Sequence, residues 1–418
     1  MTVPWLLLAL ACNRSVPSPA QPSHAPKTVV ATPAQRVWTT ADIDQLQPQP
    51  ATRLVKVPVP LDEDQVYDHT LDLLGRVVDT WGSDPGIPWA ISHALMARGA
   101  DFTVADGTPA VDALFSEYAE EFQAGGHTLV RFPLARGDLR IEPHSDLLFK
   151  VFTEVGVDPN RQVLVQGHPH PVADLYRGSV VSTWMDPRRN HSSFASPNDM
   201  PWAIQALSAW SGGPLRWTAT DGTPMSLDTV VTFTLAVLLQ ETRFLDDARK
   251  AGADFDKQDQ GVFAYTCGGA HLLQGVAAAV AEGRGPPDAA QKVKDQVPIM
   301  FYRLPRELRI YDDALKQHPE QEVRLVEQRL KFTGHFLETM SKLAALGFYV
   351  PDAEQRRLLA GAAQQLVLSV TALHRLGVFD GLSTVREDDE QLFLDIVGDS
   401  CHATRGLELA LGRGTVRY

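Results

Sequence analysis

The chain has few cysteines and less basic than acidic charge, and it lacks both long apolar runs and the common catalytic motifs. Its 418 residues include 38 Lys and Arg against 51 Asp and Glu, a net charge of −13. This balance excludes nucleic acid as a partner, because nucleic-acid binding needs basic surface. No uncharged apolar run reaches the roughly 20 residues of a transmembrane helix. No Walker loop, dinucleotide fingerprint, GxSxG elbow or HExxH motif indicates a known reaction.

A short apolar stretch at the N-terminus, Trp5 to Ala11, ends at Cys12. The triplet Leu10-Ala11-Cys12 resembles the lipobox of bacterial lipoproteins. This resemblance implies that residues 1–12 are a signal peptide with its lipidated cysteine, cut before Cys12, whose thiol then receives a diacylglycerol. We therefore expect an exported protein, anchored to a membrane through Cys12, on the periplasmic face or in the outer membrane.

Pro, Ser, Ala, Gln and Thr dominate residues 13–50, and no helical period runs through them. Such a stretch cannot bury enough apolar surface to fold, so we expect a disordered tether. Residues 51–418 are then expected to form the globular domain. The apolar content of 44% is ordinary for a globular protein.

Short sequence patterns recur in the first half of this domain. The letters PWAI at 88–91 return at 201–204, and FTVADGTP at 102–109 returns as WTATDGTP at 217–224. A weaker copy, VLVQGHP, lies at 163–169. Each of the last three stretches predicts a short β-hairpin with a glycine in its turn. Apolar positions with a helical period follow, so the expected unit is helix, hairpin, helix.

The helix starts continue at similar spacing through the second half. We expect them near Pro88, Pro143, Pro201, Gly269, Gly334 and Cys401, alternating with helices at 66–81, 111–122, 172–184, 227–241, 289–302 and 358–376. Such helical hairpins bury their apolar faces by stacking, in an open solenoid or in a closed ring. We expect a mainly α fold: a closed (α/α)6 toroid of six helical hairpins, with short β-hairpins in the first three repeats. The repeats resemble those of toroid families that include terpenoid cyclases, protein prenyltransferases and many glycan-active enzymes, a likeness of architecture and not of function.

In a toroid the inner helices place equivalent residues at one mouth. The residues at the expected starts are Trp89, His144, Trp202, His271, His335 and His402. The last three are candidate acid/base residues or metal ligands, because a helix N-terminus lowers a histidine pKa and neutral imidazole suits both tasks. Trp89, His144 and Trp202 are candidate ligand contacts. The alternative is that duplication retained these residues for structural reasons.

Cys267 and Cys401 have three alternative states. They could form a disulfide in an oxidising compartment, remain free buried thiols, or hold a metal such as zinc together with His271 and His402. The runs Thr266-Cys-Gly-Gly and Cys401-His402 are similar to those of lanthionine synthetase cyclases, helical toroids with a zinc held by two cysteines and one histidine. The resemblance implies Cys267, Cys401 and His402 as ligands.

Two functions remain open at this point. In the first, the mouth binds a ligand or a metal, and the domain is a metal-assisted enzyme acting on an unidentified small molecule, glycan or peptide. In the second, the domain is a non-catalytic binding or scaffold module of the cell envelope, with Cys267 and Cys401 as a structural disulfide. His168 and His170 are expected in a surface loop.

Overall fold

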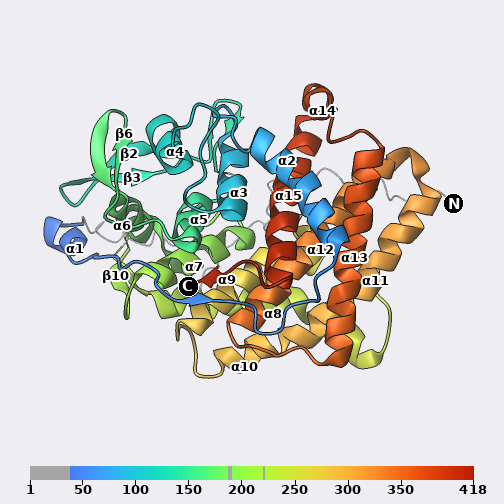
Figure 1. Cartoon of the computed structure of the whole chain (residues 1–418). Coiled ribbons are helices and arrows are strands. Elements are labelled where there is room, and N and C mark those ends of the chain that lie inside the picture. The colour runs from blue at the N-terminus through green and yellow to red at the C-terminus, as the bar shows by residue number, and fades with distance from the viewer. Residues whose placement is uncertain (1–37, 143, 187–190, 220–221) are drawn as a thin grey trace, which may run out of the picture.

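The computed structural model describes residues 38–142, 144–186, 191–219 and 222–418 (Figure 1). Cys12 and Pro143, which carry two of the expectations above, lie outside this part of the chain. Within it the fold is mainly helical with short two-stranded sheets, which confirms the expected class. None of the described helices is both long enough and apolar enough to cross a membrane.

Helices of the N-terminal half, apart from α2, are short, and from α4 onward β-hairpins separate them. They are α1 (Thr40–Asp44), α2 (Gln65–Trp81), α3 (Pro88–Arg98), α4 (Ala110–Tyr118), α5 (Leu147–Val155), α6 (Ala173–Ser182) and α7 (Met200–Trp210). Helices of the C-terminal half are mostly longer. They are α8 (Leu227–Ala251), α9 (Ala270–Ala281), α10 (Ala289–Lys294), α11 (Gln296–Gln317), α12 (Glu322–Ala345), α13 (Ala353–Arg375), α14 (Leu382–Asp388) and α15 (Glu390–Ala410). Three single 3-10 turns, η1 (Pro197–Asp199), η2 (Gly261–Ala264) and η3 (Pro319–Gln321), precede α7, α9 and α12.

Two of the three expected hairpins form. They are β6 (Gln162–Val165) with β7 (His168–Pro171), and β10 (Arg216–Thr218) with β11 (Pro224–Ser226). The first expected hairpin is reduced to a single bridge between Thr103 and Pro109. Further pairs were not expected: β2 (Glu120–Ala124) with β3 (His127–Arg131), β4 (Ala135–Arg136) with β5 (Leu139–Arg140), β8 (Met185–Asp186) with β9 (His191–Ser192), and β1 (Leu54–Val55) with β12 (Val416–Arg417).

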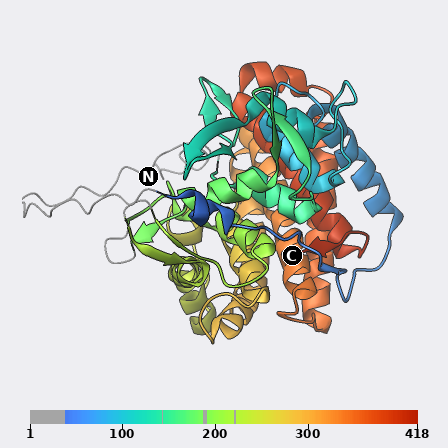
Figure 2. The same cartoon turned by 90° about the vertical axis from the view of Figure 1, so that its left-hand side faces the viewer.

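One series of helices closes on itself. Helix α3 contacts α5, α5 contacts α7, α7 contacts α9, α9 contacts α12, α12 contacts α15, and α15 returns to α3. Other helices pack against members of this series, for example α13 against α12 and α8 against α9. Figure 1 shows the hairpins at one end and the long C-terminal helices side by side at the other, and Figure 2 looks onto the hairpin end. The series brings residues far apart in the sequence close together.

The last part of the stretch expected as tether, residues 38–50, packs on the domain. Helix α1 begins with a capping box between Thr39 and Asp42, which satisfies backbone groups at its start. Trp38, Ile43 and Leu46 are buried in the main core. These three apolar side chains bury enough surface to hold residues 38–50 on the domain, which the composition of the stretch did not indicate.

Two of the expected helix starts are wrong. Gly334 lies in the middle of α12, and Cys401 lies in the middle of α15. The glycine is needed for packing: a Cβ on Gly334 would lie 3.0 Å from the backbone of Ala403. Facing it, a Cβ on Gly406 would lie 2.5 Å from the carbonyl oxygen of Gly334. The absent side chains thus let α12 and α15 approach closely.

Substitution of Gly406 by alanine should separate these two helices. We expect Gly406→Ala to lower the free energy of unfolding by about 1–3 kcal/mol, the usual cost of overpacking a dense core. Gly361→Ala is the matched control, because a Cβ at that position in α13 meets no atom within 4 Å. Alanine is the better helix former, so the control should gain about 0.5–1 kcal/mol. Urea unfolding followed by circular dichroism measures both, and equal effects of the two substitutions would contradict the packing argument.

Candidate metal centre

Three histidines from separate helices meet in the core. His271 comes from α9, His335 from α12 and His402 from α15, and one ring nitrogen of each lies within 4.8 Å of those of the other two. The ring centroids are 4.8 Å apart for His271 and His335, 5.0 Å for His271 and His402, and 3.9 Å for His335 and His402. All three side chains are buried. We call these three residues the histidine cluster.

A tight turn fixes His271 at the start of α9. Gly268 and Gly269 both adopt left-handed backbone, with φ of 59° and 76°, which favours glycine. Arg303 donates to the carbonyl oxygen of Gly268 at 2.6 Å, and its guanidinium fills the space that a Cβ there would need. His271 is the second residue of the helix and packs on the ring of Trp202 at 4.4 Å between centroids. The expected position of His271 at a helix start is therefore confirmed.

His335 and His402 reach the same point from the middles of their helices. Both histidines are next in sequence to a residue of the close α12–α15 contact. Gly334 comes directly before His335, and Ala403 comes directly after His402. Their ring contact depends on this close approach. The helix N-terminus that was expected to act on these two histidines is absent, because neither residue lies at the start of its helix.

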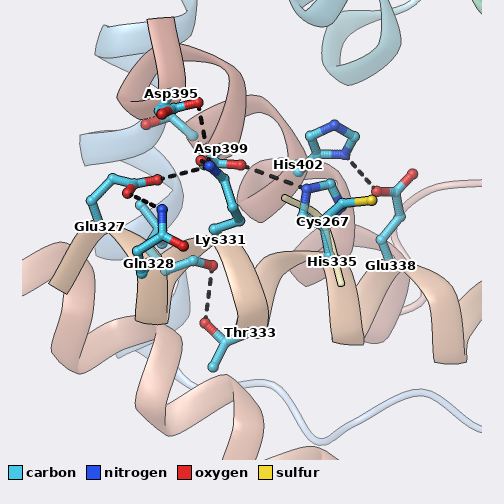
Figure 3. A network of polar contacts seen from close by, with 12 residues as sticks. Cys267, Glu327, Gln328, Lys331, Thr333, His335, Glu338, Asp395, Asp399 and His402 are labelled. Atoms are coloured by element: carbon cyan, nitrogen blue, oxygen red, sulfur yellow. Dashed lines mark hydrogen bonds and ion pairs between the residues drawn. The ribbon is translucent and has the colours of Figure 1, made fainter. Parts of the chain in front are cut away.

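A carboxylate orients one of the three rings, and a second carboxylate lies near another ring (Figure 3). Nδ1 of His402 lies 2.7 Å from Oε2 of Glu338, and Nε2 of His335 lies 3.6 Å from Oδ1 of Asp399. Nδ1 of His335 and Nδ1 of His271 are buried without a hydrogen-bond partner among the described residues. A buried ring nitrogen without a partner is costly, and a carboxylate on the other nitrogen is the usual arrangement of a metal-binding histidine.

The histidine cluster is neutral. Burial lowers the pKa of His335 to about 4 and that of His402 to about 3, and neighbouring charges alter these values less. Burial, with the nearby rings of His335 and His402, holds the pKa of His271 well below its usual range. All three imidazoles are therefore unprotonated at neutral pH, which is the form that binds a metal.

A stripe of charged residues surrounds the cluster and follows one face of α12. Its members are Glu327, Lys331, His335, Glu338 and Lys342, all buried. On one side of the cluster, Lys331 lies 3.4, 3.3 and 3.2 Å from Glu327, Asp395 and Asp399 (Figure 3). Burial raises the pKa of Glu327 to about 8, so this carboxyl holds a proton at neutral pH.

On the other side, two lysines pair with two glutamates. Lys342 contacts Glu154 at 2.5 Å and Glu338 at 2.6 Å, and Lys150 forms an ion pair with Glu154. Burial alone would raise the pKa of Glu154, but the two ammonium groups outweigh it and lower the pKa to about 2. Burial likewise opposes ionisation of Glu338, whose pKa Lys342 and His402 nevertheless hold well below its usual range. Both carboxylates are charged.

The candidate ligand contacts lie around the cluster at different depths. Trp202 packs on His271, and His144 stacks on Trp202 at 5.6 Å while its Nδ1 lies 2.8 Å from Asp199. Trp89 does not contact the cluster directly. It packs on His93 at 4.0 Å, and His93 meets His402 at 5.4 Å. His93 was not predicted as a site residue, although it follows Trp89 by four residues, which places the two side chains on one face of the helix.

The two cysteines do not join the histidine cluster, and both are free thiols. Cys267 donates to Oδ1 of Asn198 at 3.9 Å. Cys401 is fully buried on α15, and burial raises its pKa. Because successive helical residues point about 100° apart, Cys401 cannot face the same point as His402. The three-histidine group that the structure brings together thus contains His335 in place of the expected thiolates.

A second histidine group lies among the hairpins. His168 and His170 of β7 approach the same oxygen of Glu121 at 2.8 and 3.0 Å, and His170 also contacts Asp174 at 2.9 Å. Arg177 completes the group by pairing with Asp174 at 2.7 Å. His168 is exposed and His170 is buried. The contacts join two hairpins to α6.

No family model, no curated protein and no solved structure matches this chain.

The ion pairs of His170 make the stability of the domain depend on pH. Burial would lower the pKa of His170, but the hydrogen bonds to Asp174 and Glu121 outweigh it and raise the pKa. The raised pKa stabilises the fold below the unfolded value of about 6.5, and this contribution disappears as pH rises through the folded pKa. We expect His170→Gln to cost about 1–3 kcal/mol at pH 5.5 and less at pH 9. Urea unfolding at pH 5.5 and at pH 9 measures this cost, and His69→Gln, at an exposed histidine, is the control. A cost that does not change with pH would refute the ion-pair account.

Proposed function

We propose that this domain binds one divalent transition metal of the Zn²⁺ class through His271, His335 and His402, and that the metal serves chemistry on a small ligand. The observation that carries the proposal is the convergence of three buried neutral imidazoles, two of which have a carboxylate on the ring nitrogen that faces away. Three protein ligands and one open position are characteristic of catalytic zinc, whereas structural zinc has four protein ligands.

The distances fit a metal after a small movement. Nitrogen ligands lie about 2.0–2.1 Å from Zn²⁺, so tetrahedral ligands are about 3.4 Å apart. The three ligand nitrogens lie within 4.8 Å of one another, so binding would draw the rings together by on the order of 1 Å. A metal would also satisfy the unpartnered Nδ1 of His335 and supply the charge that Glu338 and Asp399 face.

A bound metal supplies a Lewis acid, which polarises a ligand or lowers the pKa of a bound water. The residues of the chain then have separate tasks. Glu338 holds the tautomer of His402, Asp399 orients His335, and Trp202 holds the ring of His271 from outside. The cluster is deeply buried, so a small molecule fits this centre better than a glycan or a peptide.

We also infer that the domain is a closed (α/α)6 toroid. The closed series of contacts from α3 through α15 supports this, since an open solenoid would not return to its first helix. Under this proposal the inner helices are α3, α5, α7, α9, α12 and α15, and the histidine cluster lies among three of them. Export as a lipoprotein anchored through Cys12 remains a proposal supported by the sequence of residues 5–12.

Metal analysis of the purified domain tests the proposed centre. We expect about one Zn²⁺ per chain, and at least a 100-fold loss of affinity in His335→Ala or His402→Ala, because two histidines bind far more weakly than three. Inductively coupled plasma mass spectrometry gives the stoichiometry, and competition with a chelator gives the affinity.

The controls separate the alternatives. His144→Ala removes a histidine outside the cluster and should retain the metal. Cys267→Ser and Cys401→Ser should retain the metal as well. Loss of the metal from either variant would show instead that the ligand set contains cysteine. A wild-type domain without metal affinity, in which the histidine variants lose only thermal stability, would favour the scaffold alternative.

Lipidation is tested separately in the full-length chain. We expect labelled palmitate to be incorporated into the wild-type protein, and we expect the labelled protein to be found in the membrane fraction of the cell. Cys12→Ser should abolish the label, because the substituted residue has no thiol to receive a diacylglycerol. Cys401→Ser is the control, and unchanged labelling of the Cys12 variant would overturn the assignment.

A further inference from the structure

A small cavity lies directly beside the histidine cluster. Its walls are formed by Ser92, His93, Met96, Leu147, Lys150, Val151, Trp202 and His402. Its volume of about 10 Å³ is close to what one water molecule requires. Two of the lining residues also belong to the surroundings of the proposed metal: His402 is one of the proposed ligands, and Trp202 packs on another.

Two polar groups face this cavity from its far wall. Lys150 is 1% exposed, and its ammonium lies 3.9 Å from the sulfur of Met96 and 5.5 Å from the ring centroid of Trp202. Nδ1 of His93 is occupied by the carbonyl oxygen of Trp89 at 2.7 Å and by Ser92 at 3.1 Å. Because a carbonyl oxygen only accepts, Nδ1 of the neutral His93 ring carries the proton, and Nε2 can accept a hydrogen bond but not donate one. The Lys150 ammonium is therefore the cationic donor beside His402.

The local charge determines which ligand fits. On this side of the cluster, Lys150 and Lys342 balance Glu154 and Glu338, so the four charged groups sum to zero. A divalent metal on three neutral imidazoles adds two positive charges. On the opposite side of His335, Lys331 balances one of the two carboxylates Asp395 and Asp399, so the other carboxylate offsets only one of these charges. Uncompensated charge in a buried site is costly. A monovalent anion in the cavity would remove the remaining excess.

We propose that this cavity is the open coordination position of the metal, and that it selects a water-sized monovalent anion, such as hydroxide or fluoride, held by Lys150. The inference rests on the proposed metal function and adds the ligand class and a specificity residue. Lys150 positions the anion, and Met96 limits its size.

Fluoride binding to the Co²⁺-loaded domain tests this, because paramagnetic broadening of the ¹⁹F resonance reports fluoride close to the metal. We expect broadening with the wild type and at least a tenfold weaker fluoride affinity in Lys150→Met, with Co²⁺ affinity retained. Glu154 keeps Lys342 as its partner in that variant. Lys150→Arg should preserve fluoride binding, and Lys250→Met, which removes an exposed lysine of α8, should change nothing.

A second variant tests the size limit independently of Lys150. Met96→Ala removes the thioether from the cavity wall, so the variant should admit azide. We expect the variant to bind azide at least tenfold more tightly than the wild type does, and the visible spectrum of Co²⁺ measures this affinity. If Co²⁺ binds but fluoride does not, or if Lys150→Met binds fluoride normally, the inference is overturned while the metal centre stands. If Met96→Ala gains no azide binding, the size limit is wrong and the inference falls. Absence of Co²⁺ binding by the wild type would overturn both proposals.

Discussion

The close contact between α12 and α15 determines the arrangement of the rest of the core. At Gly334 and Gly406 the two helices contact each other through their backbones. Cβ atoms added at these positions would lie 3.0 Å or less from main-chain atoms of the other helix. At this separation His335 and His402 come to 3.9 Å between ring centroids. A wider spacing would separate the two rings and also move Glu338 away from His402. Glycine at each of these positions therefore costs about 1 kcal/mol of helix propensity, and the absence of a side chain permits the geometry of the cluster.

The charged stripe on α12 is difficult to explain by stability alone. Replacing buried ion pairs by apolar side chains is often neutral or stabilising, whereas removing one partner typically costs about 3–5 kcal/mol. Here Glu327, Lys331, Glu338 and Lys342 occupy core positions of a long helix that leucine could fill. Strongly shifted pKa values caused by burial and specific charge partners are concentrated at functional sites. The stripe runs through the histidine cluster, so the same site accounts for both.

The sequence predicted most elements but not the way they meet. Apolar periodicity located α2, α6, α8 and α13 to within a few residues at their starts, and glycine turns located two hairpins, because both signals are local. The repeated spacing failed at Gly334 and Cys401, where no local signal distinguishes a helix start from a packing glycine or a continuing helix. His271, His335 and His402 were nevertheless predicted to lie near one another, and the structure brings the three together. The charged partners on α12 were missed, because a charged stripe at helical period normally indicates a solvated face. His93 on α3 and Lys150 on α5 lie in mostly apolar helices, where no pattern pointed to them.

The same reasoning explains why histidines and not cysteines form the proposed centre. Cys401 and His402 are neighbours on one helix, so only one of them can face the histidine cluster, and the ring contact with His335 fixes that choice. Burial outweighs the opposing charge of Arg98, raises the pKa of the Cys401 thiol, and makes the thiolate that a metal needs unfavourable. Burial has the opposite consequence for imidazole, because it favours the neutral form, which is the ligand. A dry, closely packed core therefore selects against thiolate and in favour of histidine, and the carboxylates of Glu338 and Asp399 are then required to orient the rings.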